Sequence, residues 1–489
     1  MLCLLTLLAT ALAACGGSKP ASTADGSEPT TEPSKETSTT TKDVPTLVWW
    51  TIGGQVPSNF SKAVDAMNAY AAEKIGVKVD IKVASWGEWD TKMNTIVNTG
   101  EPFDIMFTNS GKYSKQVAMG AFADITDLVQ SETPDLYKLI PQNVWDGTKI
   151  GGKYYSVPTY KDSALTQYWV FDDKYVQKYN IDINNIKTLQ DLDKPLHDMK
   201  AGEGKSFYPL PMTQGEGLNG FFNDYDDLTL GFPPVGVKAD DASRKVVSVL
   251  EQPDVMANLK LLHQWYQDGI INPDAPTKTE ADKGRPFFAA QAFPGAEISW
   301  QINDNVQKYD MVQHYGPIYT TSTIQGSLNA ISANSKYQKE ALKYLELVNT
   351  DPKLRNMLAF GELGVDYKNV DGEKVIERTT DTWPLAAYTQ GTFFNLAVTK
   401  GAPEDQWEQV KKLNEAASSS TILGFALDIS NLQTEVANCQ AVWDKYKYEL
   451  ITGASDPEKM VPKITAELKS AGMDTIMKAA QEQIDNYFK

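Results

Sequence analysis

The pattern of apolar and polar positions over residues 46–76 predicts a strand followed by a helix. Residues 46–52 read TLVWWTI, a β-branched and aromatic run that is typical of a buried strand. From Phe60 to Ile75, apolar side chains recur at the spacing of one helical face. Ser58 and Asn59 can cap this helix, and Gly76 stops it. The pattern therefore predicts a β-α unit.

Strands and helices continue to alternate over the next thirty residues. Residues 77–83 alternate Val and Ile with Lys and Asp, which predicts a strand with one buried face. A helix over residues 88–98 leads through Gly100 into the apolar run 103–107, another buried strand. This β-α-β-α-β order predicts a parallel, right-handed α/β lobe.

The N-terminal apolar run from Leu2 to Ala14 is too short to cross a bilayer, but it suits the apolar region of a signal peptide. It ends in small residues before Cys15, so residues 1–14 are predicted to be cleaved and Cys15 to carry a lipid. No Lys or Arg precedes Cys15, which we interpret as a truncated or misassigned start. The alternative is an ordinary signal peptide with a chance Cys after the cleavage site.

The segment after Cys15 is rich in Ser, Thr, Pro and acidic residues up to Pro45 and has few apolar side chains. It cannot bury enough surface to offset the entropy of ordering, so residues 15–44 are predicted to be a lipidated Cys with a disordered linker. An anchor followed by a linker indicates an extracytoplasmic protein on the outer face of the cell membrane.

Composition narrows the possible ligands. The net charge of −17 argues against nucleic acid and against an anionic membrane surface as the main ligand, because both need basic patches.

Cys439 is the one cysteine left in the mature body, and it is predicted to be a buried apolar residue. The 42% apolar content is ample for hydrophobic cores, and the length predicts two or more lobes.

Several short segments together carry a resemblance to a known family. The matching segments are residues 47–50, 100–105, 120–125, 143–147, 152–158 and 340–345. In this order they resemble the extracellular solute-binding proteins of bacterial carbohydrate ABC importers, the cluster that includes maltose-binding protein. The tail from Gly361 to Lys489 resembles the C-terminal extension of one lipoprotein branch of that cluster.

The resemblance implies an α/β fold of two lobes, with a ligand cleft between them and three crossing segments as the hinge. The crossings are expected after Val157-Pro158, near residues 317–325 and near residues 364–367. The N-lobe would then comprise residues 45–159 and 325–364, and the C-lobe residues 160–324 and 365–489. Ligands of open α/β sheets bind beyond the carboxyl ends of the strands, which agrees with this expectation.

A sugar site needs aromatic platforms flanked by side chains that donate and accept hydrogen bonds. Trp50 ends the first strand, before a polar turn with Gln55. The resemblance implies ligand groups at Thr108 and Asn109, at Asp162 and at Trp300. The predicted ligand-binding residues are Trp50, Gln55, Thr108, Asn109, Asp162, Tyr168, Trp169, Trp300, Gln301, Tyr367 and Trp383. Trp86, Trp89, Trp145, Trp265 and Trp443 are assigned to structure.

Two polar segments, residues 214–217 and 224–227, are interpreted as surface loops, and the alternative is that they line the rim of the second lobe. The acidic cluster in residues 224–227 lacks the ligand spacing of an EF-hand, which leaves calcium binding open. We expect no metal and no cofactor.

The predicted function is the capture of an oligosaccharide and its delivery to ABC permease subunits in the membrane, by a monomer. The main alternative is an extracellular glycosidase or lyase, but no local catalytic signature selects a pair of carboxylates, and His197, His263 and His314 are widely separated. A third alternative is the same fold with a peptide or another solute as its ligand.

Overall fold

The computed structural model describes residues 44–85, 87–215, 222, 224–380 and 382–489. The predicted signal peptide, Cys15, most of the predicted linker and Trp86 lie outside these described residues, as do Glu216 and Gly217. Residues Val44–Lys489 form one compact unit. Within the described ranges, every helix is too short or too polar to span a membrane.

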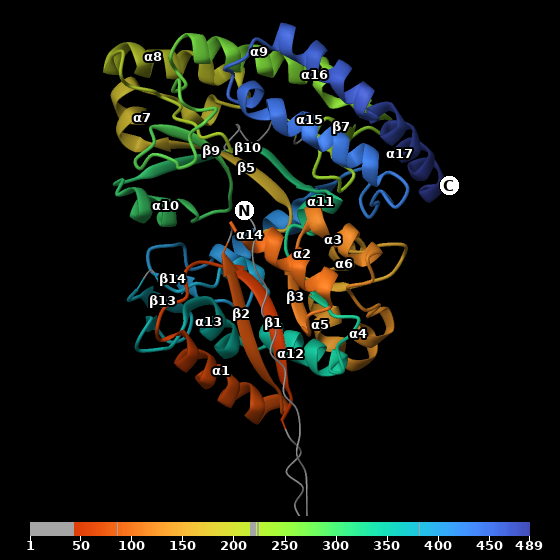
Figure 1. The fold of residues 1–489 in the computed structure, drawn as a ribbon. Helices are drawn as coiled ribbons and strands as arrows, with labels where there is room; N and C mark the ends of the chain where they lie inside the picture. The colour runs from red at the N-terminus through yellow and green to blue at the C-terminus, as the bar shows by residue number, and fades with distance from the viewer. Residues whose placement is uncertain (1–43, 86, 216–221, 223, 381) are drawn as a thin grey trace, which may run out of the picture. The chain divides into compact units, whose positions relative to one another are not determined.

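The first sheet has five strands in the order β2-β1-β3-β11-β4 (Figure 1). Its strands are β1 (Thr46–Gly53), β2 (Lys78–Ser85), β3 (Ile105–Thr108), β4 (Ser156–Pro158) and β11 (Leu328–Ile331). Strand β1 pairs parallel with both β2 and β3, so the predicted β-α-β-α-β unit is confirmed. The later strand β11 is antiparallel to β3 and β4 and makes the sheet mixed.

The first sheet and the helices around it are called here the first part of the molecule. In the chain, these helices come before β4 or after β11. They are α1 (Phe60–Ile75), α2 (Trp89–Thr99), α3 (Ser110–Ala118), α4 (Thr126–Glu132), α5 (Pro134–Leu139), α6 (Gln142–Asp146), α12 (Gln338–Thr350) and α13 (Pro352–Phe360). Helix α1 ends at Gly76, which adopts a φ of 67°, as predicted. The predicted cap at its start is wrong, because the Asn59 side chain donates to Asp366 Oδ1 (2.9 Å) instead of capping the helix.

Side chains of β1 point to the two opposite faces of the sheet, and each face has its own hydrophobic core. Leu47 and Trp49 pack with α1 and α12 on one face of the sheet. Trp50 and Ile52 pack on the other face, where α2 contributes Trp89. The strand is therefore buried on both sides, which explains its continuous apolar sequence.

The second sheet has four strands in the order β15-β10-β5-β9. They are β5 (Leu165–Asp172), β9 (Phe287–Gln291), β10 (Tyr309–Tyr319) and β15 (Ser418–Ser419). Strand β5 is buried along its whole length and pairs antiparallel with β10 and β9. The register between β5 and β10 shifts at His314, so this residue is an irregularity in the ladder.

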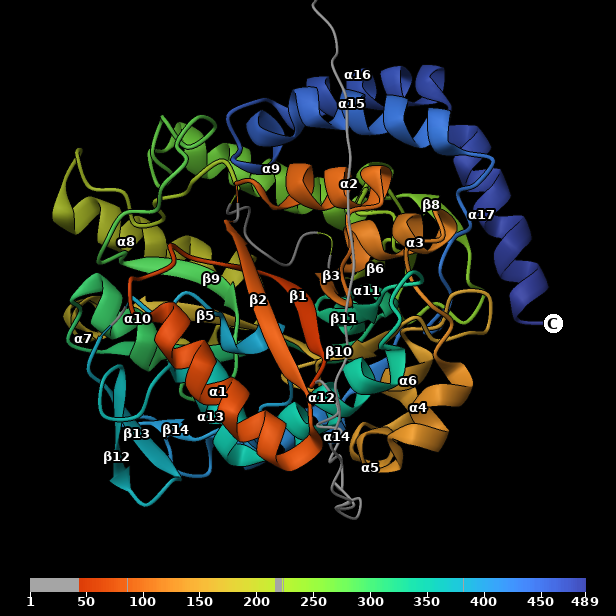
Figure 2. The same cartoon turned by 60° about the horizontal axis from the view of Figure 1, so that its bottom comes forward.

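Helices from two distant stretches of the chain cover this second sheet. They are α7 (Asp173–Tyr179), α8 (Asp193–Glu203), α9 (Pro253–Gln267), α10 (Glu297–Asp304), α15 (Gln433–Ile451), α16 (Pro457–Ala471) and α17 (Met473–Tyr487). Short 3-10 turns lie at η1 (Ile183–Asn185), η2 (Gln190–Leu192), η3 (Val249–Glu251) and η4 (Ala387–Thr389). Helices α15 and α16 pack side by side, and α16 also contacts α9 (Figure 2).

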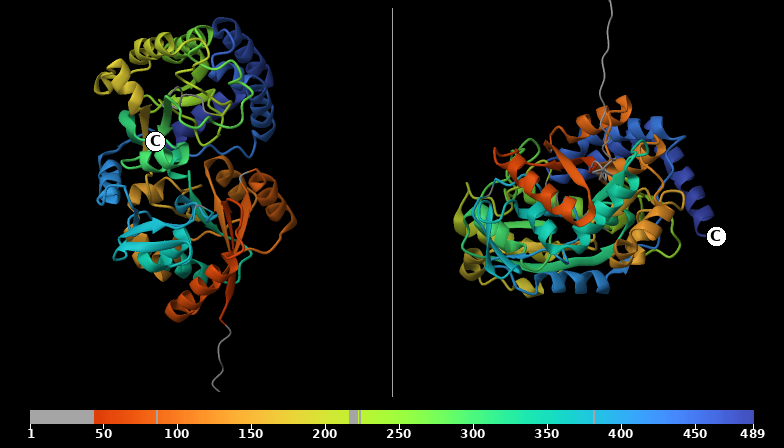
Figure 3. Two further views of the ribbon diagram at one scale, coloured as in Figure 1. Left: turned by 90° about the vertical axis from the view of Figure 1, so that its left-hand side faces the viewer. Right: turned by 90° about the horizontal axis from the view of Figure 1, so that it is seen from below.

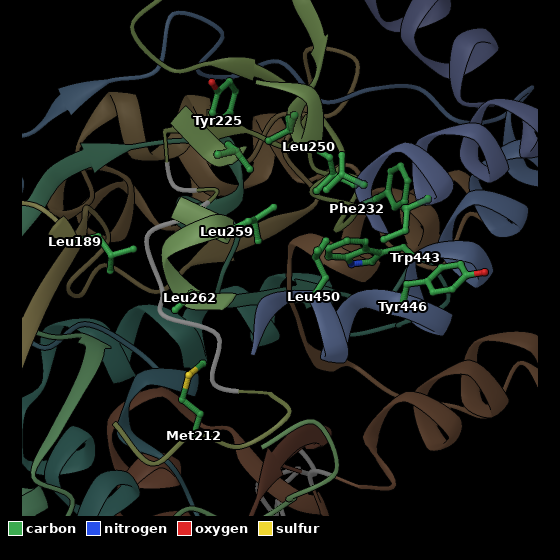
Figure 4. Packing of buried hydrophobic residues seen from close by; sticks show 14 of the residues in the cluster. Leu189, Met212, Tyr225, Phe232, Leu250, Leu259, Leu262, Trp443, Tyr446 and Leu450 are labelled. Carbon is green, nitrogen blue, oxygen red and sulfur yellow. The ribbon is translucent and has the colours of Figure 1, made fainter. Parts of the chain in front are cut away.

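The largest hydrophobic core lies among these helices. Leu259 and Leu262 of α9 pack with Trp443 and Leu450 of α15 in the same cluster (Figure 4). Cys439 is fully buried in this core, as predicted. The tryptophans assigned to structure that the described ranges include, which are Trp89, Trp145, Trp265 and Trp443, are all buried.

Two small sheets complete the fold. One contains β6 (Tyr225–Asp226), β7 (Val235–Lys238) and β8 (Val246–Ser248), and the other β12 (Tyr367–Asp371), β13 (Val375–Arg378) and β14 (Val398–Thr399). The second of these packs on the end of α13 through Phe360, Tyr367 and Ile376. Figure 3 shows the strands of this sheet, in cyan, next to the helices of the first sheet.

Three stretches of chain connect the two large sheets. The first joins β4 to β5, and the second joins β10 to β11 through α11 (Thr321–Ile324). The third contains α14 (Gln406–Ala416). Before α14, residues 383–397 still contact the first sheet: Leu385 bridges to Gly53, and Thr389 accepts a hydrogen bond from Asn329. The chain thus remains on the first sheet well past the third crossing predicted at residues 364–367.

Candidate ligand-binding site

The first sheet holds four of the predicted site residues. Gln55, Thr108 and Asn109 lie at its carboxyl end, but Trp50 lies in the middle of β1 and does not end the strand as predicted. Trp50 is 9% exposed and lines a cavity of about 480 Å³ beside α2. Gln55 is exposed in the turn after β1. Thr108 is buried and donates through Oγ1 to Gln116 Oε1 (2.5 Å), so its hydroxyl is already engaged. Asn109 is half-buried just before α3.

Asp162 lies in the first crossing and pairs with its neighbour Lys161. The Lys161 Nζ to Asp162 Oδ1 distance is 2.7 Å, and the side chains are only 12% and 15% exposed. Lys161 Nζ also lies 6.0 Å from the ring centroid of Tyr388, which belongs to the segment 383–397 on the first sheet. Asn414 of α14 fixes the crossing by donating to Lys161 O and accepting from Ala164 N. Charged groups are thus held where three separate segments meet.

Tyr168 and Trp300 lie together in a small aromatic cluster on one face of the second sheet. Trp300 is half-buried and packs edge-on against Phe288, with ring centroids 5.2 Å apart. Burial, and then the Glu297 carboxylate, raise the pKa of Tyr168 to about 12. Gln301 Oε1 accepts from Tyr309 N (2.9 Å), so this amide has a structural partner.

Trp169 lies on the other face of β5 and stacks on His314. The two rings are 3.4 Å apart and nearly parallel. Trp169 Nε1, His314 Nε2 and the neighbouring Gln167 Oε1 are buried and lack hydrogen-bond partners among the described residues. Burial lowers the pKa of His314 to about 4, which keeps the imidazole neutral at physiological pH. These groups offer both donors and acceptors.

The structure places Tyr367 and Trp383 in packing contacts. Tyr367 packs against Phe360, with ring centroids 5.8 Å apart. Trp383 packs against Phe60 and donates its indole N–H to Leu358 O (2.9 Å). Both side chains therefore have partners within the first part of the molecule.

A second aromatic cluster joins residues that sequence reasoning missed. Phe293 follows β9, Phe393 belongs to the segment 383–397 on the first sheet, and Trp407 lies in α14. The ring centroids of Phe393 and Trp407 are 4.8 Å apart, and those of Phe293 and Trp407 are 5.7 Å apart. No local pattern marks these residues, because only the tertiary fold brings the three segments together.

Seven of the described tryptophans show two different environments of the indole nitrogen. Trp49, Trp145, Trp265 and Trp383 donate to protein acceptors. Trp50, Trp169 and Trp407 are buried without such a partner in the part of the chain that is described. A buried donor without an acceptor is costly, so these three nitrogens are exceptions to the usual pairing of buried polar groups.

The acidic segment 224–227 differs from the surface loop that the sequence favoured. Asp226 belongs to β6 and is 1% exposed. Asp227 accepts from Ser322 Oγ in the second crossing (2.5 Å). Across the described ranges, no group of three or more His, Cys, Asp or Glu side chains is arranged to hold a metal ion.

Comparison with known families gives two matches. The family described as "Bacterial extracellular solute-binding protein" matches residues 53–353. A domain of unknown function, DUF3502, matches residues 421–489, which include α15, α16 and α17.

Individual proteins match over most of the chain. A carbohydrate ABC transporter substrate-binding protein of Streptococcus pneumoniae serotype 4 is 27% identical over 91% of this chain and 92% of its own length. The crystal structure of the N-glycan transport solute binding protein NgtS of S. pneumoniae is 25% identical, covers 91% of this chain and 99% of its own, and has a TM-score of 0.80. The NgtS complex with Man5GlcNAc is 26% identical over 91% of this chain and 98% of its own, with a TM-score of 0.75.

Proposed function

This chain belongs to the family of bacterial extracellular solute-binding proteins, and we propose that it captures an oligosaccharide of the N-glycan type for a carbohydrate ABC importer. The observation that carries the proposal is the similarity to NgtS along 91% of this chain, together with the NgtS complexes with Man5GlcNAc and Man1GlcNAc. The family places the protein outside the cytoplasm.

The chemistry of the candidate site supports a neutral sugar as the ligand. Aromatic rings pack against the apolar faces of sugars, and the ligand hydroxyls need both donors and acceptors. Lys161 supplies a donor and Asp162 an acceptor at the first crossing. Because the Lys161–Asp162 pair is internally neutralised, the site does not demand a charged ligand.

The proposed mechanism is closure of two lobes around the glycan. A ligand that contacts both lobes favours the closed state through its differential affinity, and the permease subunits then recognise that state. We place the third crossing at residues 399–417, because residues 383–397 contact the first sheet. The other predicted lobe boundaries are retained as proposals, as are the lipid on Cys15, anchoring to the membrane, and the monomeric state.

Isothermal titration calorimetry tests this function. The full chain is titrated with Man1GlcNAc, Man5GlcNAc, a maltooligosaccharide and a short peptide. We expect saturable binding of the mannose-containing glycans with unit stoichiometry, and no binding of the peptide. Binding of the peptide alone would favour the other solute class and contradict the proposal.

Capture without turnover is the second part of the proposal. The protein is incubated with Man5GlcNAc, and new reducing ends are measured over hours. We expect none above the protein-free control. New reducing ends at a rate proportional to protein concentration would instead establish the carbohydrate-active enzyme that the sequence left open.

A further inference from the structure

Residues 227–231, called here the strained loop, connect β6 to β7 with an unusual backbone. Leu228 and Thr229 have φ angles of 61° and 63°, and Gly231 follows with 62°. A positive φ is uncommon outside glycine, and for a β-branched residue such as Thr it is an outlier. Backbone strain of this kind persists only where the surrounding structure enforces it, and it is concentrated at ligand clamps and switch regions.

Two neighbouring carboxylates hold the strained loop in this conformation. Asp226 accepts a hydrogen bond from Leu228 N (3.2 Å). Asp227 accepts from Thr229 N (3.2 Å) and from Gly231 N (3.1 Å). The Leu228 side chain is fully buried in the largest hydrophobic core, which anchors the loop to the second lobe. The loop is therefore rigid before any ligand binds.

The strained loop is also bound to the second crossing. Ser322 Oγ of α11 donates to Asp227 Oδ1 (2.5 Å). Helix α11 in turn contacts α3 of the first part of the molecule. A rotation of the lobes at this crossing therefore changes the distance between the loop and α3.

The end of the strained loop lies close to the start of α3. A β-carbon placed on Gly231 would lie 3.9 Å from the Cα atom of Gly111. Both glycines are exposed, so the two backbones approach each other at the surface of the lobes and not inside a core. Gly111 closely follows Thr108 and Asn109, the predicted ligand groups at the end of β3. The approach thus lies beside the candidate site.

Building on the proposed function, we propose that the strained loop is a preformed contact surface against which the start of α3 docks when the two lobes close around the glycan. Because the loop is already ordered, closure does not have to order it. Glycine on both sides lets the two backbones meet without a side chain between them. This contact favours the closed state in addition to the contacts that the glycan makes.

A pair of cysteines tests the contact. Gly111→Cys and Gly231→Cys are combined in the full chain, where the 3.9 Å approach brings the two thiols within disulfide range. Oxidised glutathione is added with and without Man5GlcNAc, and the disulfide is followed by mass spectrometry. We expect the glycan to speed its formation several-fold, because it raises the closed population. Each single variant controls for disulfides with other cysteines. A rate that the glycan leaves unchanged, or no disulfide in either condition, would overturn the proposal.

A bulky side chain at the contact is the second test. Gly111→Phe adds a ring at an exposed position of α3, so the core stays intact. We expect calorimetry to show roughly tenfold weaker binding of Man5GlcNAc, because the apparent affinity falls with the fraction of protein that can close. Gln130→Phe, at an exposed position of α4, is the matched control and should keep the wild-type affinity.

The two proposals fail in different ways. Unchanged affinity of folded Gly111→Phe would overturn the contact, while glycan binding by the unmodified protein would leave the proposed function intact. If the unmodified protein binds neither Man1GlcNAc nor Man5GlcNAc, both proposals fail.

Discussion

Asp226 is a carboxylic acid buried next to the second and third crossings. Burial, and then the neighbouring Asp227, raise its pKa to about 7, although hydrogen bonds from Ser420, Leu228 and Thr321 act in the opposite direction. In an unfolded chain the pKa of an Asp is about 3.9. Between these two values the folded protein holds a proton that the unfolded chain has lost.

This difference predicts how stability depends on pH. The contribution of Asp226 to the free energy of unfolding falls as the pH rises from about 4 to about 7, and the full cost of ionising a buried carboxyl remains above pH 7. Asp226→Asn cannot ionise and keeps the oxygen that accepts from Leu228 N. We expect the variant to be more stable than the wild type above pH 7 by a few kcal/mol, with the difference vanishing toward pH 4.

Urea unfolding at a series of pH values measures the effect. Asp241→Asn is the control, because hydrogen bonds from Ser243 hold the pKa of that exposed carboxyl below its usual range. Removing the Asp241 charge with this substitution should not stabilise the protein at high pH. A difference between Asp226→Asn and wild type that stays constant with pH would refute the assignment of the raised pKa.

Single residues show where sequence reasoning reaches its limit. Trp50 and Trp169 are buried with unsatisfied indole nitrogens. Trp50 was predicted from its place at the end of the first expected strand, and Trp169 from its place shortly after the first crossing. Trp383 was chosen on similar grounds, yet its indole donates to Leu358 O. Trp407 was not chosen at all. The composition of a segment does not reveal the partner of an indole nitrogen, because that partner comes from distant parts of the chain.

At the scale of elements, the buried Arg355 ties α13 to the segment between β13 and β14. Its guanidinium donates to the backbone oxygens of Ala387, Gly391 and Thr392 and to the Gln390 side chain. Burial lowers its pKa to about 9. The side chain thus supplies the donors for a turn that otherwise has buried, unpaired carbonyl groups.

Arg355→Met should destabilise the protein because these acceptors lose their donor. Relief from burying a cation offsets part of the loss, so we expect the free energy of unfolding to fall by about 2–3 kcal/mol. Chemical denaturation measures it, with Lys353→Met as the matched control on the exposed side of the same helix. A loss no larger than that of the control would show that the turn does not depend on Arg355.

Elements with local signals were predicted well, and elements set by distant contacts were not. Strand β1 and helix α1 match their predicted ranges within a few residues, because period and a stop glycine are local properties. The family and the α/β fold are also confirmed by the match over residues 53–353. The course of residues 383–397 could not be predicted, since Arg355 and the last residue of β1, Gly53, fix it across long separations in sequence.

At the scale of the whole molecule, the three crossings are tied to one another by hydrogen bonds. Thr159 N donates to Ser327 O (3.0 Å), and Ser420 N donates to Tyr319 O (2.7 Å). Asn414 bridges the first and third crossings, since its amide both donates to Lys161 O and accepts from Ala164 N. Lobe movement about these segments must therefore bend them together, and the same ties orient the Lys161–Asp162 pair.

Asn414→Ala cuts this bridge and should affect stability and binding together. We expect the free energy of unfolding to fall by about 1–3 kcal/mol, because two buried backbone groups lose their partner. Glycan affinity should fall as well, since Lys161 is no longer held in place. Gln409→Ala is the control on the same helix, where the amide makes only an exposed hydrogen bond to Asp405.

Small-angle X-ray scattering extends this test to lobe closure. Saturating Man5GlcNAc should reduce the radius of gyration of the wild type, because a ligand held by both lobes favours the closed state. Asn414→Ala should need more glycan to reach the same radius, in proportion to its loss of affinity. If saturated wild-type protein scatters like the free protein, the ligand does not close the lobes, and the crossings serve as rigid connections instead of a hinge.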